Sequence, residues 1–352
     1  MTSSPTNLII AADCGGTKGD FLLVDAESGV PIRRVQKEAD TLPPELAPSL
    51  RPGRGGGRSV EMGNYCLGKL LEGFSPQKIH LIYTGLNYDE SIFSSRGITE
   101  VNKFVCCEED GIMISEECRV GICSILGTGA TTMIYWNTER PFVIDALGPI
   151  CGDWGGGCYI GAHFVRNVLR EQNFTHGEMW ETGEILSFLK GQMEKLGEPP
   201  VEKADASCWE IVRIFLRHYD RTFVASLARL CDSCARKGSS IARQVLENAG
   251  QEVAINTYRG AFFTGINALK IIPVIVSGSI FLHSDFVYES FCRTLQEKLP
   301  QAQIKRSFRP QIYGQTIKML ELLHGPQANS RIERFKQEAA ELFSKTLCSP
   351  RR

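Results

Sequence analysis

The chain has 352 residues, with 39 basic and 40 acidic side chains and a formal net charge of −1. This length exceeds the usual size of a single hydrophobic core, so we expect two domains with a cleft between them. The balanced charge gives no net field that would attract nucleic acid or an anionic membrane, and no segment approaches the roughly 20 apolar residues of a membrane helix, so a small-molecule partner is favoured.

The N-terminal segment has no charged region, no long apolar run and no small-residue cleavage site. The 13 cysteines are an odd number, scattered through apolar segments. We therefore expect a soluble, cytoplasmic protein with reduced thiols. Cys231 and Cys234 have helical spacing and no second pair that would complete a zinc site, so we interpret them as buried helix cysteines.

The first part of the chain alternates between apolar runs and Gly-containing turns, which predicts a three-strand meander followed by further strands and helices. The expected elements are strands at 8–13, 21–29 and 31–36, a helix at 59–74, a strand at 78–85, a short helix at 89–96 and a strand at 103–110. The Arg- and Gly-rich segment 51–58 could hold an anion or nucleic acid. Because it has no interleaved aromatic residues, we interpret it as a solvated loop.

A second β-rich unit then begins, and the pattern becomes helical from Trp154 onward. The expected strands are at 121–129, 131–137, 141–148, 273–279 and 303–307, and the expected helices are at 157–171, 183–193, 208–219, 222–238, a long segment ending near 270, 284–299 and 314–325.

The two halves therefore repeat one order of strands and helices. This order predicts an α/β fold of two ribonuclease-H-like (actin-like ATPase) domains with an interdomain cleft and helical insertions in the second domain. We place the first domain at 1–116, the second at 117–326 and a helical tail at 327–352. The tail carries apolar residues on one face, which predicts an amphipathic helix. We expect this helix to dock back onto the chain; the alternative is pairing with a partner, for which a homodimer is the candidate.

Two Gly-containing turns are candidate phosphate sites. In the first, Asp13 ends an apolar strand and is followed by Gly15, Gly16, Thr17 and Lys18. Glycines let backbone N–H groups approach a phosphate, a Thr hydroxyl can bind its oxygens, and Asp13 could hold Mg²⁺ through water. The alternative is an ordinary hairpin turn.

The second turn consists of Gly127, Thr128 and Gly129 between two apolar strands. Two such turns are more informative than one. Neither matches the GxxxxGK[ST] phosphate loop, and no GxGxxG leads from a strand into a helix, so P-loop and dinucleotide-binding folds are disfavoured.

Together with two later motifs, these turns resemble those of N-acetylglucosamine kinases. That group belongs to the BadF/BadG/BcrA/BcrD-type ATPase family, within the sugar-kinase, heat-shock and actin superfamily. The resemblance covers roughly residues 8–323. The matching motifs, in the family's order, are 13–18, 126–129, 147–148 with 152–153, and 276–279.

The resemblance implies MgATP-dependent phosphorylation of an amino sugar, most closely N-acetylglucosamine to its 6-phosphate. Asp13 to Lys18 and Gly127 to Gly129 would bind the phosphates. Gly278 and Ser279 would hold the adenosine, and Gly148 and Asp153 the sugar. The family usually reads Gly-Asp-Glu-Gly-Ser where this chain has Gly-Asp-Trp-Gly-Gly at 152–156.

A gapless count from Gly127 puts Glu108 where the family has the Asp that deprotonates the sugar hydroxyl. A loop shortened by two residues would favour Asp110. If the strand at 103–110 stays extended, Glu108 and Asp110 share one side and Glu109 faces the other. Alternatively, all three acids begin a helix, where they complement its dipole.

Two other functions stay open. One is a regulatory ATPase resembling the activators of acyl-CoA dehydratases, which hold an iron–sulfur cluster through cysteines. The other is a non-catalytic sugar or nucleotide sensor, suggested by the altered segment 152–156.

Overall fold

The computed structural model describes residues 6–15, 18–38, 60–137, 140–175, 179–195, 208–218 and 220–347. Contacts divide them into two compact units. The first contains the described residues up to Arg119 and from Ser307 onward, and the second contains those from Val120 to Arg306. The sequence-based boundary near 116 lies close to this division. Residues 307–326, which we assigned to the second domain, instead belong to the first unit.

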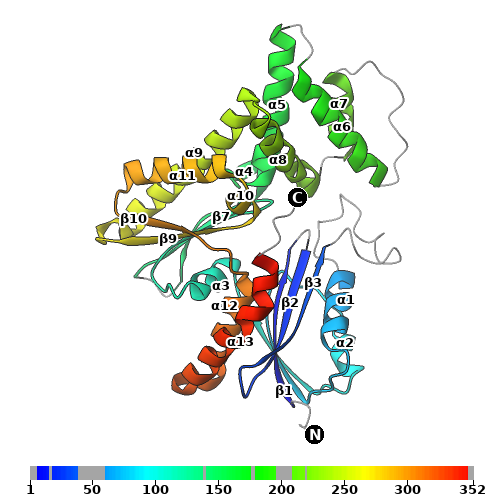
Figure 1. Cartoon of the computed structure of the whole chain (residues 1–352), viewed down its shortest axis with the longest axis vertical. Coiled ribbons are helices and arrows are strands. Elements are labelled where there is room, and N and C mark those ends of the chain that lie inside the picture. The colour runs from blue at the N-terminus through cyan, green and yellow to red at the C-terminus, as the bar shows by residue number, and fades with distance from the viewer. Residues whose placement is uncertain are drawn as a thin grey trace. The chain divides into compact units, whose positions relative to one another are not determined.

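The first unit contains a five-stranded mixed sheet in the order β3-β2-β1-β4-β5 (Figure 1). The central strand β1 pairs antiparallel with β2 and parallel with β4, and β4 pairs parallel with β5. Both faces of β1 are covered, which explains its unbroken apolar run. The strands are β1 (Asn7–Cys14), β2 (Lys18–Asp25), β3 (Pro31–Glu38), β4 (Lys78–Thr84) and β5 (Glu100–Val105).

Helices cover the two faces of this sheet. Leu8 and Ile10 of β1 pack in a cluster with α1, whereas Ile9 and Ala11 pack with α12 and α13. In Figure 1, α1 and the red C-terminal helix α13 accordingly flank the blue strands from opposite sides. The helices are α1 (Val60–Leu70), α2 (Ser91–Ser94), α3 (Glu108–Ser115), α12 (Gln311–His324) and α13 (Asn329–Leu347).

The C-terminal helices explain why the chain returns to the first unit. Helix α13 buries Ile332, Phe335, Ala339 and Phe343 in the same cluster as α12, as the amphipathic pattern predicts. Helices α3 and α12 cross so closely that a Cβ added at Gly314 would collide with the backbone of Gly111. That α12 belongs to the first unit therefore depends on its packing against α3, which no local sequence pattern predicts.

The second unit repeats the first sheet's topology, in the order β10-β9-β6-β7-β8. Here β6 pairs antiparallel with β7 and parallel with β9, as β1 does with β2 and β4. The predicted duplication of an α/β fold is therefore confirmed. The strands are β6 (Gly121–Leu126), β7 (Ala130–Tyr135), β8 (Phe142–Asp145), β9 (Ile272–Ser277) and β10 (Ala302–Arg306).

A layer of helices completes the second unit's hydrophobic cluster. The two shortest, α4 and α10, had no sequence signal. The helices are α4 (Gly148–Cys151), α5 (Gly157–Thr175), α6 (Trp180–Lys195), α7 (Cys208–His218), α8 (Arg221–Arg236), α9 (Ser240–Thr264), α10 (Ser279–His283) and α11 (Asp285–Lys298).

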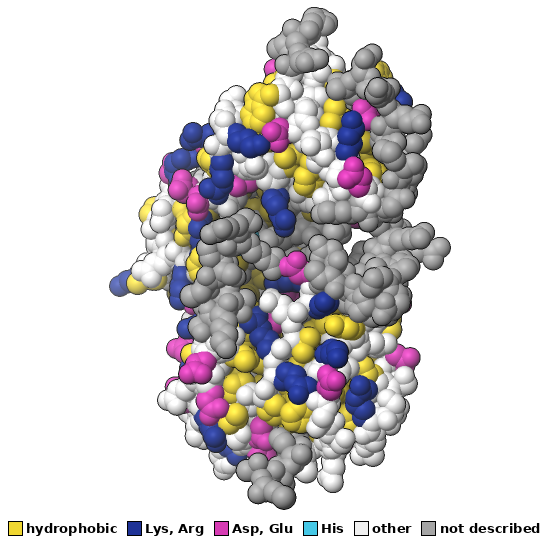
Figure 2. Space-filling view, turned by 45° about the vertical axis from the view of Figure 1, so that its right-hand side comes forward, with side chains coloured by type: hydrophobic (Ala, Val, Ile, Leu, Met, Phe, Trp, Pro, Cys, Tyr) yellow, Lys and Arg dark blue, Asp and Glu magenta, His cyan; other side chains and the backbone are white. Residues whose placement is uncertain are grey.

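Several features outside the core follow from composition. Cys231 and Cys234 are free thiols buried in α8, as predicted, and burial raises the pKa of Cys234 to about 11. Basic and acidic side chains are interspersed on the surface seen in Figure 2, as near-equal numbers of the two would give. Among the helices of the described residues, none is long and apolar enough to cross a membrane. Gly16, Thr17 and the segment 51–58 lie outside the described residues.

Candidate functional site

In the first unit, Asp13, Thr84 and Glu108 lie at the same edge of the sheet. Strands β1, β4 and β5 are parallel, so their carboxyl ends lie together. Asp13 pairs in register with Thr84, the last residue of β4. Glu108 begins α3 directly beyond β5. Open α/β sheets bind ligands at the carboxyl ends of their parallel strands, so this edge is where a ligand is expected.

The carboxylates at this edge interact electrostatically. Burial raises the pKa of Asp13 well above its ordinary value, the charge of Glu108 raises it further, and Lys18 opposes the shift. Asp20, opposite Asp13 on β2, also raises it and is held by Arg34 through two bonds of 2.8 and 2.6 Å. Asp13 and Glu108 are thus brought together from distant parts of the sequence.

This group of carboxylates suits a hard cation. Magnesium prefers oxygen ligands and is usually bound by one or two carboxylates, with water and phosphate completing its shell. Within the described ranges, no three His, Cys, Asp or Glu side chains are arranged to hold a metal by themselves. Asp13 therefore fits a magnesium ion shared with a nucleotide better than a protein-only metal site.

The acidic run after β5 is helical rather than extended. Helix α3 starts at Glu108, and Glu108, Glu109 and Asp110 form its first turn. The predicted strand alternation is therefore wrong, because the chain turns into the helix at Cys107, and the helical alternative is correct. Asp110 forms an ion pair of 2.7 Å with Lys318 of α12, whereas Glu109 is buried and burial raises its pKa to about 7.

In the second unit, the two predicted nucleotide motifs lie beside each other. Strands β6 and β9 are parallel neighbours, with Ile125 opposite Ser277, so their next residues share one sheet edge. Gly278 has φ of +90° and lies against the Leu126 backbone, with no space for a side chain. Ser279 then begins α10. The Gly-Thr-Gly turn and the Gly278 loop thus converge, as an ATP site requires.

The Gly-Thr-Gly turn is fixed by the start of α5. The N–H groups of Gly157 and Cys158 donate to the carbonyls of Gly127 and Thr128 at 2.8 and 3.0 Å. In a trans peptide the carbonyl and the following N–H point in opposite directions. The N–H groups of Thr128 and Gly129 therefore point away from α5, and an anion on that side could accept hydrogen bonds from them.

Asp153, the predicted sugar ligand, lies next to this turn. It is 1% exposed and has φ of +57°, and its Oδ2 accepts a 2.6 Å bond from Arg221 at the start of α8. A side chain on Gly129 would collide with the Arg221 guanidinium and approach Asp153. Gly148, the other predicted sugar residue, begins α4 with φ of +79°.

A second carboxylate supports the Asp153 segment. Burial and the charge of Asp153 raise the pKa of Asp145 to about 6, against bonds that its carboxylate accepts from the Asp153 N–H, the Asn256 side chain and the Trp154 N–H. The rings of Trp154 and Tyr159 pack edge to face nearby.

Sequence reasoning missed Arg221, Asp145 and Lys318. Each is an ordinary charged residue without a motif. The partners of Arg221 and Lys318 are remote in sequence, whereas Asp145 accepts bonds from the nearby Asp153 and Trp154 N–H groups as well as from the remote Asn256. Arg221 had one weak local signal, because it follows Asp220, which caps α8 by accepting N–H bonds from Thr222 and Phe223.

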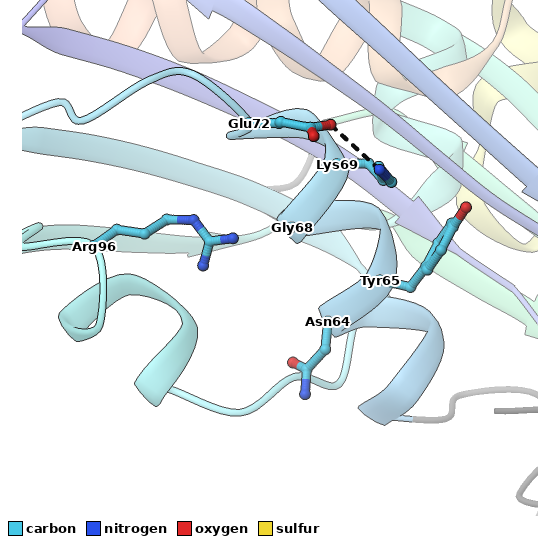
Figure 3. A pocket seen from close by; sticks show the side chains of 6 residues that line it. All are labelled: Asn64, Tyr65, Gly68, Lys69, Glu72 and Arg96. Carbon is cyan, nitrogen blue, oxygen red and sulfur yellow. Dashed lines mark hydrogen bonds and ion pairs between the residues drawn. The ribbon is translucent and has the colours of Figure 1, made fainter. Parts of the chain in front are cut away.

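Two surface hollows of the first unit lie away from these residues. One, of about 360 Å³, is lined by α1 and Arg96. Figure 3 shows Lys69 paired with Glu72 there, and the Arg96 guanidinium directed toward α1 near Gly68. The other lies at the starts of β1, β4 and β5, opposite the edge that carries Asp13. Neither contains a predicted site residue, so we assign them no role.

Comparison with known proteins gives a distant but extensive likeness. No family model matches the chain. The N-acetylmuramic acid/N-acetylglucosamine kinase of Clostridium acetobutylicum is 22% identical over 256 residues, which cover 71% of this chain and 79% of that protein.

Solved structures share the fold. A proposed N-acetylglucosamine kinase from Chromobacterium violaceum matches with a TM-score of 0.60 and 16% identity, over 89% of this chain and 98% of that one. A proposed N-acetylglucosamine kinase from Porphyromonas gingivalis gives 0.54 and 14%, over 90% and 99%. A hexokinase from Schistosoma mansoni complexed with glucose gives 0.51 and 15%, over 90% and 86%. The chain thus resembles N-acetylglucosamine kinases in sequence and has the actin-like ATPase fold of these sugar kinases.

Proposed function

We propose that this chain is an ATP-dependent sugar kinase that phosphorylates an amino sugar, specifically N-acetylglucosamine on its 6-hydroxyl. The observation that carries the proposal is the convergence of the Gly-Thr-Gly turn, the Gly278 loop and Asp153 with Arg221 in one unit. The kinase from Clostridium acetobutylicum supports the substrate class, because its name specifies amino-sugar substrates.

In this proposal, the second unit holds most of the nucleotide. The outward N–H groups of Thr128 and Gly129 would bind phosphate oxygens, and the loop at Gly278 and Ser279 would hold the adenosine. A side chain at Gly278 would collide with Leu126, so the tight turn there requires glycine. The other proposed phosphate-binding residues are Asp13, Gly15 and Lys18 of the first unit, together with Gly16 and Thr17 from outside the described residues.

The proposed proton acceptor lies in the first unit. Glu108 is the proposed base, because Asp110 is paired with Lys318 and Glu109 is buried, whereas Glu108 interacts with Asp13. Asp13 would hold Mg²⁺, which when bound neutralises charge on the phosphates. Glu108 would accept the sugar hydroxyl proton as the oxygen attacks the terminal phosphorus, and ADP would leave.

Sugar recognition would depend on Asp153 and Gly148. A carboxylate accepts hydrogen bonds from two hydroxyls and discriminates against analogues that lack them. The left-handed backbone at Asp153 is held by Asp145 and by the Arg221 pair, so its carboxylate has one direction. Such fixed geometry is what substrate positioning requires.

The test is a coupled ADP-release assay with N-acetylglucosamine, glucosamine, glucose and N-acetylmannosamine. We expect sugar-dependent turnover, highest with N-acetylglucosamine. Glu108→Gln should lower kcat by about 10²-fold or more with ATP affinity nearly unchanged, because general-base assistance contributes about 10²–10⁴-fold. Glu72→Gln, an exposed acid on the far side of the same unit, is the matched control and should retain full turnover.

The outcomes separate the alternatives. If Asp110→Asn rather than Glu108→Gln abolished turnover, the base assignment would be wrong by two residues. ATP hydrolysis without any sugar dependence would favour a regulatory ATPase, and anaerobic absorbance would then test for an iron–sulfur cluster. Ligand binding without any turnover would favour a sensor.

A further inference from the structure

Arg221 stands at the junction of the two proposed subsites of the second unit. It is the first residue of α8, whose start is fixed by the Asp220 cap. Its Nη2 donates to Asp153 Oδ2 at 2.6 Å, and its Nη2 also lies where a Cβ of Gly129 would be. One guanidinium thus touches both the proposed sugar ligand and the proposed phosphate turn.

The two partners of this ion pair differ in exposure. The Asp153 side chain is 2% exposed, whereas the Arg221 side chain is 47% exposed. Asp153 is therefore the fixed member, and the guanidinium faces solvent beside the turn. A guanidinium carries five N–H donors in a rigid fork that matches phosphate oxygens, and the bond to Asp153 uses one of them.

The backbone of the turn also favours an anion at this point, while Asp153 balances the charge of Arg221. The turn presents the N–H groups of Thr128 and Gly129 away from α5, and it contains no negatively charged side chain of its own. A side chain at Gly129 would displace the guanidinium, which gives a physical reason for glycine there. A guanidinium with unused N–H donors, beside the outward N–H groups of the turn, is suited to bind the oxygens on which charge develops during phosphoryl transfer.

We propose that Arg221 is a further catalytic residue, which contacts the transferred phosphoryl group while Asp153 holds its guanidinium in place. The inference rests on the proposed function. As the bond from the terminal phosphorus to the ADP oxygen breaks and the bond to the sugar oxygen forms, the sugar proton passes to Glu108. Arg221 exchanges no proton and stabilises the charge on the equatorial phosphoryl oxygens.

The test compares Arg221→Gln and Arg221→Lys with the parent. We expect Arg221→Gln to lower kcat by about 10²-fold or more, with sugar KM changed less than about threefold, since an arginine at this step contributes about 10³-fold or more in related phosphoryl transfers. Arg221→Lys keeps the charge and the pair with Asp153 but lacks the fork, so it should recover only part of the rate.

Arg236 provides the matched control. It lies at the other end of α8, is 52% exposed and pairs with Asp232 at 2.7 Å. Arg236→Gln should leave kcat and KM unchanged. If Arg221→Gln does not fold, Arg221→Lys carries the test, with an expected decrease in kcat of about tenfold.

A purely structural role for Arg221 predicts a different result. Arg221→Gln would then raise sugar KM as Asp153→Asn does and leave kcat at saturation unchanged, and that outcome would overturn the inference. Full kcat in Arg221→Lys would also overturn it.

Calorimetry separates failure of this inference from failure of the proposed function. We expect Arg221→Gln to weaken binding of a non-hydrolysable ATP analogue about tenfold and to leave ADP binding within about twofold, because only the analogue has the terminal phosphate. Equal effects on both nucleotides would overturn the inference. A parent chain that binds neither nucleotide would instead refute the proposed function.

Discussion

Asp145→Asn should stabilise the fold near neutral pH while removing a charge that supports the Asp153 segment. Asp145 ends the edge strand β8 with φ of +69°. Burial, then the charge of Asp153, raises its pKa to about 6 from an ordinary 3.8. The native state therefore resists ionising a group that ionises readily in the unfolded chain.

The direction and size of the expected stability change follow from this difference between the folded and unfolded chain. Because the folded pKa is raised, the stability contributed by the neutral form is fully present below about pH 4 and is lost as pH rises through about 6. A shift of about two units corresponds to roughly 3 kcal/mol, and solvent screening of this half-buried group reduces it to about 1 kcal/mol. Asn is neutral at every pH and would retain that free energy, which corresponds to a Tm increase of roughly 2–4 °C.

Thermal unfolding of the parent and Asp145→Asn between pH 4 and pH 8 measures this effect. We expect the Tm values to converge near pH 4 and to separate above pH 6, with the variant more stable. Asp89→Asn is the control, and its effect on stability should have the opposite sign. The N–H and hydroxyl of Ser91 lower the pKa of Asp89, so the folded state favours the ionised carboxylate that the substitution removes. A constant difference across the pH range, or a variant less stable than the parent at pH 7.5, would refute the reasoning.

Three further predictions concern neighbouring residues. Asp153→Asn should raise sugar KM far more than ATP KM, since it weakens hydroxyl recognition; equal changes in both constants would indicate a structural acid. Gly278→Ala should reduce the free energy of unfolding by about 2 kcal/mol and weaken ATP binding, because its φ of +90° and its contact with Leu126 exclude a Cβ; denaturant unfolding with unchanged stability would contradict this. Ala146→Gly should stabilise by up to about 1 kcal/mol, because Ala146 has φ of +61°; a lower unfolding midpoint in urea would count against that strain.

Much of the fold could be predicted because it depends on local patterns. The buried strands β1, β4 and β6 are predominantly apolar runs, and the apolar face of α13 is visible in its spacing. The duplicated order of strands and helices therefore predicts two related sheets. The short helices α4 and α10 were missed, because each closely follows a strand whose predicted range extended to the first residue of the helix, and four or five residues show little helical period.

The acidic run at Glu108 shows where local reasoning fails. Strand and helix are both compatible with a few charged residues, and the sequence left them open. Packing of α3 on α12, with Gly111 against Gly314 and Asp110 paired with Lys318, selects the helix. The roles of the predicted site residues remain proposals, although the structure brings several of them together.

By itself, the sequence determined the two α/β halves, the strand-end positions of Asp13 and Gly127, and the resemblance to N-acetylglucosamine kinases, because each depends on residues adjacent in the chain. Only the tertiary structure decided that α12 belongs to the first unit, that Asp13 interacts electrostatically with Glu108, and that Arg221 and Asp145 contact the Asp153 segment. Most of these relations join residues far apart in sequence, and a charged side chain has no local pattern that indicates its partner, even for the nearby pair of Asp145 and Asp153. These relations arise from burial and charge pairing within each folded unit.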